Sequence, residues 1–318
     1  MNLLYRSQIA ERVRKFYDKC PFNFPEDSDL SVDLIKKTPP DIDIYCPPLV
    51  DELRGRFNIP FVKGSRGMGG IRMSVAMTKL FHSCRKKSIL EIGSGAGHLI
   101  NSTSYHYGVK CVGIDFCEKA IEYSREVAKK LKCNSEFVHK DIFDFFPKEK
   151  YPVIISMGVL HHTGDCHGAI SHIIRNCLQP GGCLAIGLYH KYGRKPFLDH
   201  FQKMKERGSV DEMRESFSSM FKGGANERMI ESWFRDQVLH PHETQHLLSE
   251  IAPLMQSEGV DVVSTSINSF KEISSIGDVF SSEDRMMDVG NKRLLERSYF
   301  PGFFVVFGKK IKGESNGN

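Results

Sequence analysis

The sequence predicts an α/β fold with a doubly wound, mostly parallel sheet of seven strands and a helical cap. Between residues 88 and 189, short apolar runs alternate with segments of helical periodicity. This alternation is typical of parallel strands whose connecting helices cover both faces of a sheet. Two more apolar runs, 260–265 and 303–307, follow much later in the chain. We expect these two to pair as a hairpin at the edge of the sheet.

The first five strands are runs rich in branched apolar or aromatic residues, and turn-forming residues separate them from their neighbours. They are expected at 88–93, 110–115, 135–139, 153–159 and 181–188. Helices are expected between them, at about 96–106, 117–132 and 165–178. Pro180-Gly-Gly182 indicates the turn before the fifth strand.

The rest of the chain has helical rhythm, with apolar residues spaced as in Ile9–Phe16. Helices are expected at 71–83 and from His242 to Ser257. The connection 267–298 is long for a compact domain, so it should carry structure of its own. The predicted organisation is an N-terminal helical cap or lid (1–85), a ligand-binding core (86–190), a helical cap insertion (191–240), a C-terminal part of the core (241–312) with the insertion 267–298, and a disordered tail (313–318).

The composition is ordinary for a globular protein, with 26% charged and 40% hydrophobic residues. The net charge is +5, but the basic residues are spread along the chain, so nucleic acid is not favoured as a partner. No apolar run approaches the ~20 residues of a membrane helix, so no membrane association is expected. The nine cysteines include no CxxC pair, and no secretory segment opens the chain. These features favour reduced thiols and a cytoplasmic location; the oligomeric state is left open.

The stretch Ser88-Ile-Leu-Glu-Ile-Gly-Ser-Gly-Ala-Gly97 reads as a strand, a glycine-rich turn and the start of a helix. Glycines without a Cβ would let a ligand lie against the backbone, beside the free N–H groups of the next helix. Asp115 ends the following apolar run, where its carboxylate can accept both hydroxyls of a ribose. The pattern therefore predicts a ligand that contains a nucleoside.

Further chemistry-bearing residues follow the next two strands. Asp141 comes directly after the third strand, where it could bond an adenine amino group, and the fourth strand ends in Ser156-Met-Gly-Val-Leu-His-His-Thr163. Open parallel sheets bind ligands at the carboxyl ends of their strands. We therefore expect these residues and the glycine turn to face one crevice.

At this point the chain resembles the class I S-adenosylmethionine-dependent methyltransferases, over roughly residues 86–190. The resemblance rests on five segments in order: Glu91-Ile-Gly-Ser-Gly-Ala-Gly97, Gly113-Ile-Asp115, Lys140-Asp141, Gly158-Val-Leu-His-His162 and Leu178-Gln-Pro-Gly-Gly182. It implies a seven-stranded Rossmann-like methyltransferase fold and S-adenosyl-L-methionine as the cofactor. The contacts it implies for that cofactor are Glu91, Gly93, Ser94, Gly95, Gly97, Asp115, Phe116, Asp141, Ile142 and Met157.

The main competing interpretation is a dinucleotide-binding dehydrogenase, whose fingerprint is GxGxxG. Here the third glycine, Gly97, comes one residue early. Glu91, just before the turn, also suits a ligand with an ammonium group better than a diphosphate. A second glycine-rich loop, 64–70, precedes Arg72. Arg72 could reach the carboxylate of the cofactor, although a plain flexible linker is an equal interpretation.

The candidate catalytic residues are His161, Tyr189, His190, His240 and His242. His161 and His162 follow the fourth strand. Either could act as a base, or both could pack and hydrogen-bond at the wall of the crevice. Tyr189 and His190 end the fifth strand and should face the same cleft. His240-Pro-His242 could belong to an acceptor pocket, or Pro241 could begin a helix. No third ligand is visible near these two histidines, so no metal is expected.

The resulting functional prediction is methyl transfer from S-adenosylmethionine to an O, N or C atom of a small metabolite or natural product. The alternatives are an RNA (tRNA) or peptide acceptor, and a non-catalytic module that binds the cofactor as a partner. Arg194 could hold a carboxylate or phosphate of the acceptor, because its planar guanidinium suits both; a surface salt bridge is the alternative.

Overall fold

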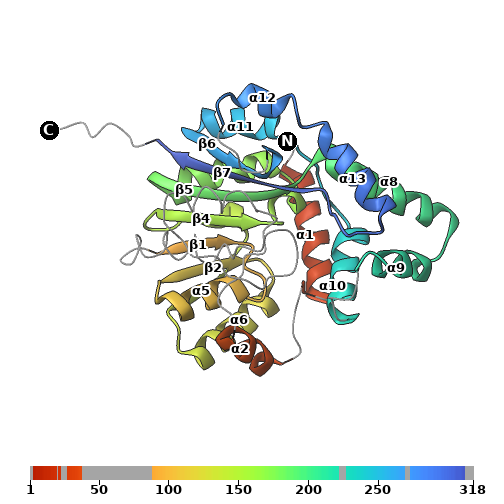
Figure 1. The fold of residues 1–318 in the computed structure, drawn as a ribbon. Coiled ribbons are helices and arrows are strands. Elements are labelled where there is room, and N and C mark those ends of the chain that lie inside the picture. The colour runs from red at the N-terminus through yellow and green to blue at the C-terminus, as the bar shows by residue number, and fades with distance from the viewer. Residues whose placement is uncertain are drawn as a thin grey trace.

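The computed structural model describes residues 3–19, 21–22, 27–37, 88–221, 227–268 and 273–311. Its seven strands form one sheet in the order β3-β2-β1-β4-β5-β7-β6 (Figure 1). β7 runs antiparallel to β5 and β6, and the other pairs are parallel. This confirms the predicted sheet and the antiparallel pairing of its last two strands. The strands are β1 (Ile89–Ile92), β2 (Cys111–Asp115), β3 (Ser135–His139), β4 (Tyr151–Met157), β5 (Leu178–Tyr189), β6 (Val260–Thr265) and β7 (Phe303–Lys310).

The helices of the described chain form two sets. One set covers the two faces of the sheet, and the other lies beyond one end of it. Those on the sheet or on its covering helices are α2 (Ser28–Lys37), α5 (His98–Tyr107), α6 (Glu118–Leu131), α7 (Cys166–His172), α11 (Leu248–Ser257) and α12 (Ile276–Phe280). The others are α1 (Leu3–Lys19), α8 (Lys191–Arg207), α9 (Val210–Ser218), α10 (Glu227–Val238) and α13 (Arg285–Leu295). None of the helices in the described ranges is long and apolar enough to cross a membrane.

The sheet is buried on both faces because its strands carry apolar residues at successive positions. In β1, Leu90 belongs to the cluster that includes residues of α7 and α11, whereas Ile89 belongs to the cluster that includes residues of α5 and α6. Successive side chains of a strand point to opposite faces, which assigns one cluster to each side. The helix layers therefore hold the carboxyl ends of the parallel strands in a fixed arrangement.

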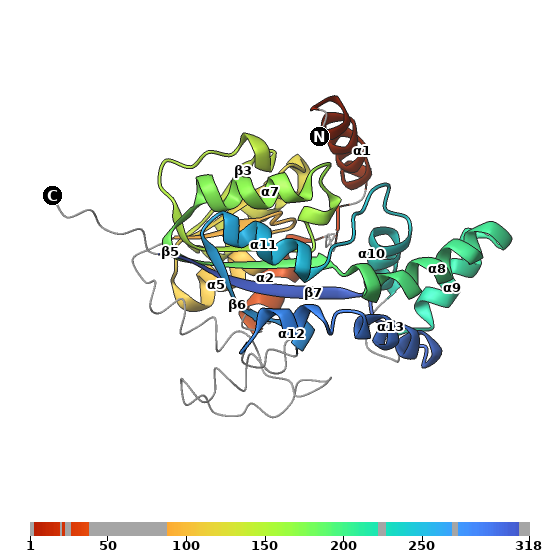
Figure 2. The ribbon, with the colours of Figure 1, turned by 90° about the horizontal axis from the view of Figure 1, so that it is seen from above.

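A second group of helices gathers where those carboxyl ends lie (Figures 1 and 2). α8, α9 and α10 share a small core of their own, built on Phe217 and Phe234. α1 crosses beside α10 and is tied to distant segments, since Arg12 donates to the carbonyl of Pro241 at 2.9 Å and Lys119 donates to the carbonyl of Asp18 at 2.9 Å. These helices are positioned to cover one end of the sheet.

The helix expected from His242 to Ser257 begins later than predicted, at Leu248. The preceding segment lies between two parts of the core. Thr244 N–H donates to the carbonyl of His161 at 2.8 Å, and His246 N–H donates to the carbonyl of Tyr189 at 2.9 Å. These long-range backbone bonds replace the helical ones, so Pro241 does not begin a helix. The predicted helix 71–83 and the loop 64–70 lie outside the described residues.

Candidate active site

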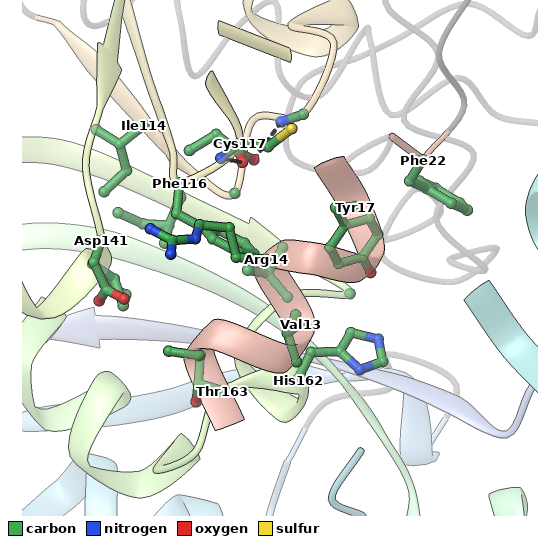
Figure 3. A pocket seen from close by; sticks show the side chains of 18 of the residues that line it. Val13, Arg14, Tyr17, Phe22, Ile114, Phe116, Cys117, Asp141, His162 and Thr163 are labelled. Carbon is green, nitrogen blue, oxygen red and sulfur yellow. Dashed lines mark hydrogen bonds between the residues drawn. The ribbon is translucent and has the colours of Figure 1, made fainter. Parts of the chain in front are cut away.

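A cavity of about 900 Å³ opens at the carboxyl ends of the central strands. The glycine turn after β1, the ends of β2 and β4, and the loop after β3 contribute to its wall. α1 runs across it with Val13, Arg14 and Tyr17 on the inner side (Figure 3). Sequence segments far apart in the chain thus meet around one space, as the positions of the motifs predicted.

Two positions of the turn require glycine, each for a different physical reason. Both have positive φ, 72° at Gly93 and 50° at Gly95. A Cβ at Gly93 would lie 2.3 Å from a methyl group of Val159, so packing excludes a larger residue there. A Cβ at Gly95 would meet no atom within 4 Å, and Gly95 lines the cavity. The space above Gly95 is therefore open to a ligand that lies on the backbone.

Asp115 lies at the end of β2 and holds the turn in place. One carboxylate oxygen accepts Gly95 N–H and the other accepts Cys117 N–H, each at 2.8 Å. Burial raises the pKa of Asp115, and the backbone bonds oppose that rise. Each carboxylate oxygen has a further lone pair, so the side chain can still accept hydrogen bonds from hydroxyl groups of a ligand in the cavity.

Asp141 begins the short 3-10 helix Ile142–Asp144, and one of its oxygens accepts Phe143 N–H at 2.9 Å. The carboxylate has a second oxygen, and Asp141 lines the cavity. Phe116 and Ile142 line the same part of the wall. An acceptor oxygen thus lies on the same cavity wall as apolar side chains, a combination that suits a purine carrying an amino group.

Glu91 and Ser94 do not line the cavity, although both were expected near the cofactor. Glu91 is 9% exposed, and its Oε2 has no hydrogen-bond partner in the described chain. Burial, followed by the charge of Asp115, raises the pKa of Glu91 well above its usual range. The Ser94 hydroxyl likewise has no partner within the described ranges. Both are polar groups directly behind the turn.

His162 faces the opposite end of the cavity from Asp141 (Figure 3). Its Nδ1 lies 2.9 Å from the carbonyl oxygen of His242. A carbonyl only accepts, so Nδ1 carries a proton, and in the neutral form of the ring Nε2 has the lone pair. That Nε2 is buried and has no partner among the described residues. In that form His162 is a proton acceptor whose ring is oriented by the carbonyl of His242.

His240 packs against His162, with ring centroids 3.8 Å apart and the ring planes tilted by 35°. Its Nδ1 accepts His242 N–H at 3.1 Å, so its single lone pair is in use and Nε2 carries the proton. Burial and the neighbouring His162 lower the pKa of His240 to about 2. In His162, Asp236 and His240, atoms of the kind that bind metals lie within 4.8 Å of one another. Asp236 is thus a possible third ligand, which the sequence did not reveal. With the His240 lone pair engaged, we assign no metal to this group.

Asp236 was not among the predicted site residues, yet it lines the cavity from α10. Tyr17 donates its hydroxyl proton to Oδ1 at 2.7 Å, and Gln237 Nε2 donates to Oδ2 at 3.1 Å. Burial raises the pKa of Asp236, although His162 and the Tyr17 bond oppose the rise. No spacing rule links α10 to the core, so the sequence analysis did not find this carboxylate.

Tyr189 lines the cavity at the end of β5, with the guanidinium of Arg194 3.9 Å from its ring centre. Arg194 is fully buried and makes two bonds to Glu243, at 3.0 and 2.7 Å. It also donates to the carbonyl of Gln237 at 2.7 Å. The hydrogen-bond donors of the guanidinium are engaged by Glu243 and Gln237. Arg194 therefore forms no surface ion pair and is not available to an anionic acceptor.

The other predicted catalytic residues lie behind this wall. His161 is fully buried against the Tyr189 ring, at 4.0 Å between ring centres. His190 turns away from Tyr189 and contacts Glu283 through Nε2 at 3.1 Å. His242 donates from Nε2 to the carbonyl of Thr163 at 3.1 Å. Arg72 lies outside the described residues.

Residues 84–223 match the family model of a methyltransferase domain. The match covers the glycine turn, Asp115, Asp141 and His162, which meet around the cavity. The chain contains a class I S-adenosylmethionine-dependent methyltransferase domain. The resemblance noted from the sequence is thereby confirmed for this part of the chain.

Two curated relatives are similar to this domain over short stretches. The chain is 28% identical to the uncharacterized protein YjhP of Escherichia coli over 101 residues, 31% of this chain and 40% of that protein. It is 27% identical to the ubiquinone biosynthesis O-methyltransferase of Hydrogenovibrio crunogenus over 112 residues, 35% of this chain and 46% of the relative. The chain thus spans less than half the length of either relative.

The fold also matches solved structures. PKMT2 from Rickettsia typhi superposes with a TM-score of 0.55 at 15% sequence identity, covering 74% of this chain and 51% of that protein. A second structure of PKMT2, in complex with AdoHcy (S-adenosylhomocysteine), matches with a TM-score of 0.54 at 15% identity and covers 72% and 49%. These likenesses confirm the methyltransferase fold.

Proposed function

We propose that this domain binds S-adenosylmethionine in the cavity and transfers its methyl group to a small-molecule acceptor. One observation supports this most directly. A single cavity joins a turn with open backbone at Gly95, a ribose-type acceptor at Asp115 and an unpartnered proton acceptor at His162. The first two are what a nucleoside cofactor needs, and the third is what an acceptor with a removable proton needs.

The residues present fit this cofactor. Gly95 leaves room for its amino-acid end, Asp115 would accept the ribose hydroxyls, and Asp141 would accept from the adenine amino group. Behind the turn, Glu91 Oε2 has no hydrogen-bond partner in the described chain, so it would be an acceptor for the ammonium end. When bound, the cofactor supplies a methyl group on a positively charged sulfur, which is displaced in line by the acceptor atom.

The protein's own contribution is positioning and proton removal. The acceptor atom must lie opposite the sulfur, and holding both reactants in one enclosed space accounts for most of the acceleration. His162 Nε2 would take a proton from the acceptor, because its Nδ1–H is fixed on the carbonyl of His242. Tyr189 and Tyr17 would form the walls on either side.

A small molecule is favoured over RNA or a peptide by the way the cavity is covered. α1 crosses it and is bonded to α10 through the contact between Tyr17 and Asp236. Beside Asp236 the wall carries a carboxylate and aromatic rings, which do not attract the phosphates of RNA, although Arg6, Arg14 and Lys140 also line the cavity. The similarity to a ubiquinone biosynthesis O-methyltransferase points in the same direction.

The experiment is calorimetry on the full chain with AdoHcy and with NAD, followed by transfer of labelled methyl groups. We expect AdoHcy to bind and NAD not to bind. Tritium from S-adenosylmethionine should then appear in the small-molecule fraction of a cell extract and not in its RNA or protein. Binding of NAD alone would refute the proposed cofactor, and label in RNA would refute the proposed acceptor class.

A further inference from the structure

We propose that the acceptor is an amine, which enters as an ammonium ion and is bound by Asp236. This inference rests on the proposed function, because it names the acceptor of the same site. Three features support it: the charge of Asp236, the aromatic walls beside it, and the position of His162.

The Asp236 carboxylate has neutral partners in the described chain. Tyr17 and Gln237 each donate one hydrogen bond to it. His162 and Arg194 also act on it, but His162 makes no hydrogen bond to it in the described chain, and the guanidinium of Arg194 is matched by the carboxylate of Glu243. Asp236 is 7% exposed, so water compensates its charge poorly. A buried carboxylate without its own cation is costly, and a cationic ligand removes that cost.

The walls beside Asp236 suit the same ligand. Tyr17, Tyr189 and Phe303 all line the cavity. Phe303 lies edge-on to Tyr189, with ring centres 6.2 Å apart. Aromatic faces attract cations through their quadrupole, and they accommodate the apolar body of an amine as well. A carboxylate or phosphate group placed beside Asp236 would meet its charge, and the neighbouring Arg194 is engaged by Glu243; the cations Arg6, Arg14 and Lys140 line the cavity from α1 and from the loop after β3.

His162 completes the chemistry that an ammonium ion requires. An ammonium nitrogen has no lone pair, so one N–H bond must break before transfer. The proton passes to His162 Nε2, and the electron pair stays on nitrogen. That pair forms the bond to the methyl carbon while the carbon–sulfur bond breaks, and its electrons go to sulfur. The product is a methylated ammonium ion, and the protonated His162 faces the carboxylate of Asp236.

The test uses three ligands of matched size on the full chain saturated with AdoHcy: phenethylamine, 2-phenylethanol and phenylacetate. They share the phenyl ring and differ in the charge of the end group. By calorimetry we expect phenethylamine to bind wild-type protein at least about tenfold more tightly than the other two, as for a charge-assisted hydrogen bond. Equal affinities, or a preference for phenylacetate, would overturn the amine assignment.

Asp236→Asn should abolish the preference, because it keeps the shape and removes the charge. The matched control is Asp199→Asn, which removes an exposed carboxylate paired with Lys195 on α8 and should keep the preference. An Asp236→Asn protein that folds, binds AdoHcy and still prefers phenethylamine would refute the role of Asp236. If that variant does not fold, the wild-type ligand series decides by itself. Failure of wild-type protein to bind AdoHcy would instead refute the proposed function.

Discussion

Gly95 provides the sharpest test of how the cofactor is held, because the chain contains a matched glycine. Gly95 and Gly108 have similar backbone angles, φ 50° and 64°, and a Cβ at either position would meet no atom within 4 Å. Gly95 lines the cavity, whereas Gly108 ends α5 away from it. An alanine at either site should therefore cost the same backbone strain, and only the alanine at Gly95 should obstruct a ligand.

The left-handed conformation costs an L-residue about 1–2 kcal/mol, so both variants should melt a few degrees lower than wild type. In Gly95→Ala the added methyl group occupies the space of the ligand. Overfilling a packed site costs about 1–3 kcal/mol, which is a loss of about 5- to 150-fold in affinity. Gly108→Ala should bind AdoHcy as wild type does.

The assay is calorimetry with AdoHcy beside thermal melting of the wild type and both variants. Unchanged affinity in Gly95→Ala would show that the ligand does not lie on this backbone. An equal loss of affinity in both variants would show that general destabilisation, and not contact, is the cause. Either result would refute the argument from the open space above Gly95.

Three further predictions concern the acceptor base and the buried charges. His162→Gln should keep AdoHcy affinity and lower methyl transfer by about 10²–10⁴-fold, as for loss of a general base, and a wild-type rate would exclude that role. Arg194→Met leaves the buried Glu243 carboxylate without its cation and should lower the free energy of unfolding in urea by about 3–5 kcal/mol; adding Glu243→Gln should recover part of the loss, and no recovery would contradict the pairing. Burial, with a smaller effect of a neighbouring histidine, lowers the pKa of His246 from 6.5 to about 4. The unfolded chain therefore takes up a proton in that window that the folded chain does not, and stability falls as the pH falls. His246→Gln should lose about 1–3 kcal/mol less than wild type between pH 7 and pH 4 in urea titrations, and identical losses would contradict the shifted pKa.

The strands and the cofactor end of the cavity could be predicted because their signals are local. A strand shows itself in a run of branched apolar residues, and the glycine turn shows itself in spacing. Asp115 and Asp141 follow their strands directly, so the rule that parallel strands bind ligands at their carboxyl ends was enough to bring them together.

The acceptor end could not be predicted in the same way, because it depends on which way side chains turn and on segments distant in the chain. Among adjacent histidines, His162 lines the cavity and His161 lies behind it, a difference that no periodicity shows. The extended course of residues 242–247 replaced a predicted helix because its backbone N–H groups found partners on other elements.

By itself, the sequence determined the class I methyltransferase core, the turn that receives the cofactor and the acidic residues that follow β2 and β3. Only the tertiary structure decided that Asp236 of α10 meets Tyr17 of α1, that Arg194 is neutralised by Glu243, and that the free lone pair belongs to His162. The reason is physical. Backbone conformation follows from nearby residues, whereas the charge and the hydrogen-bonding state of a buried side chain follow from whatever the fold packs against it.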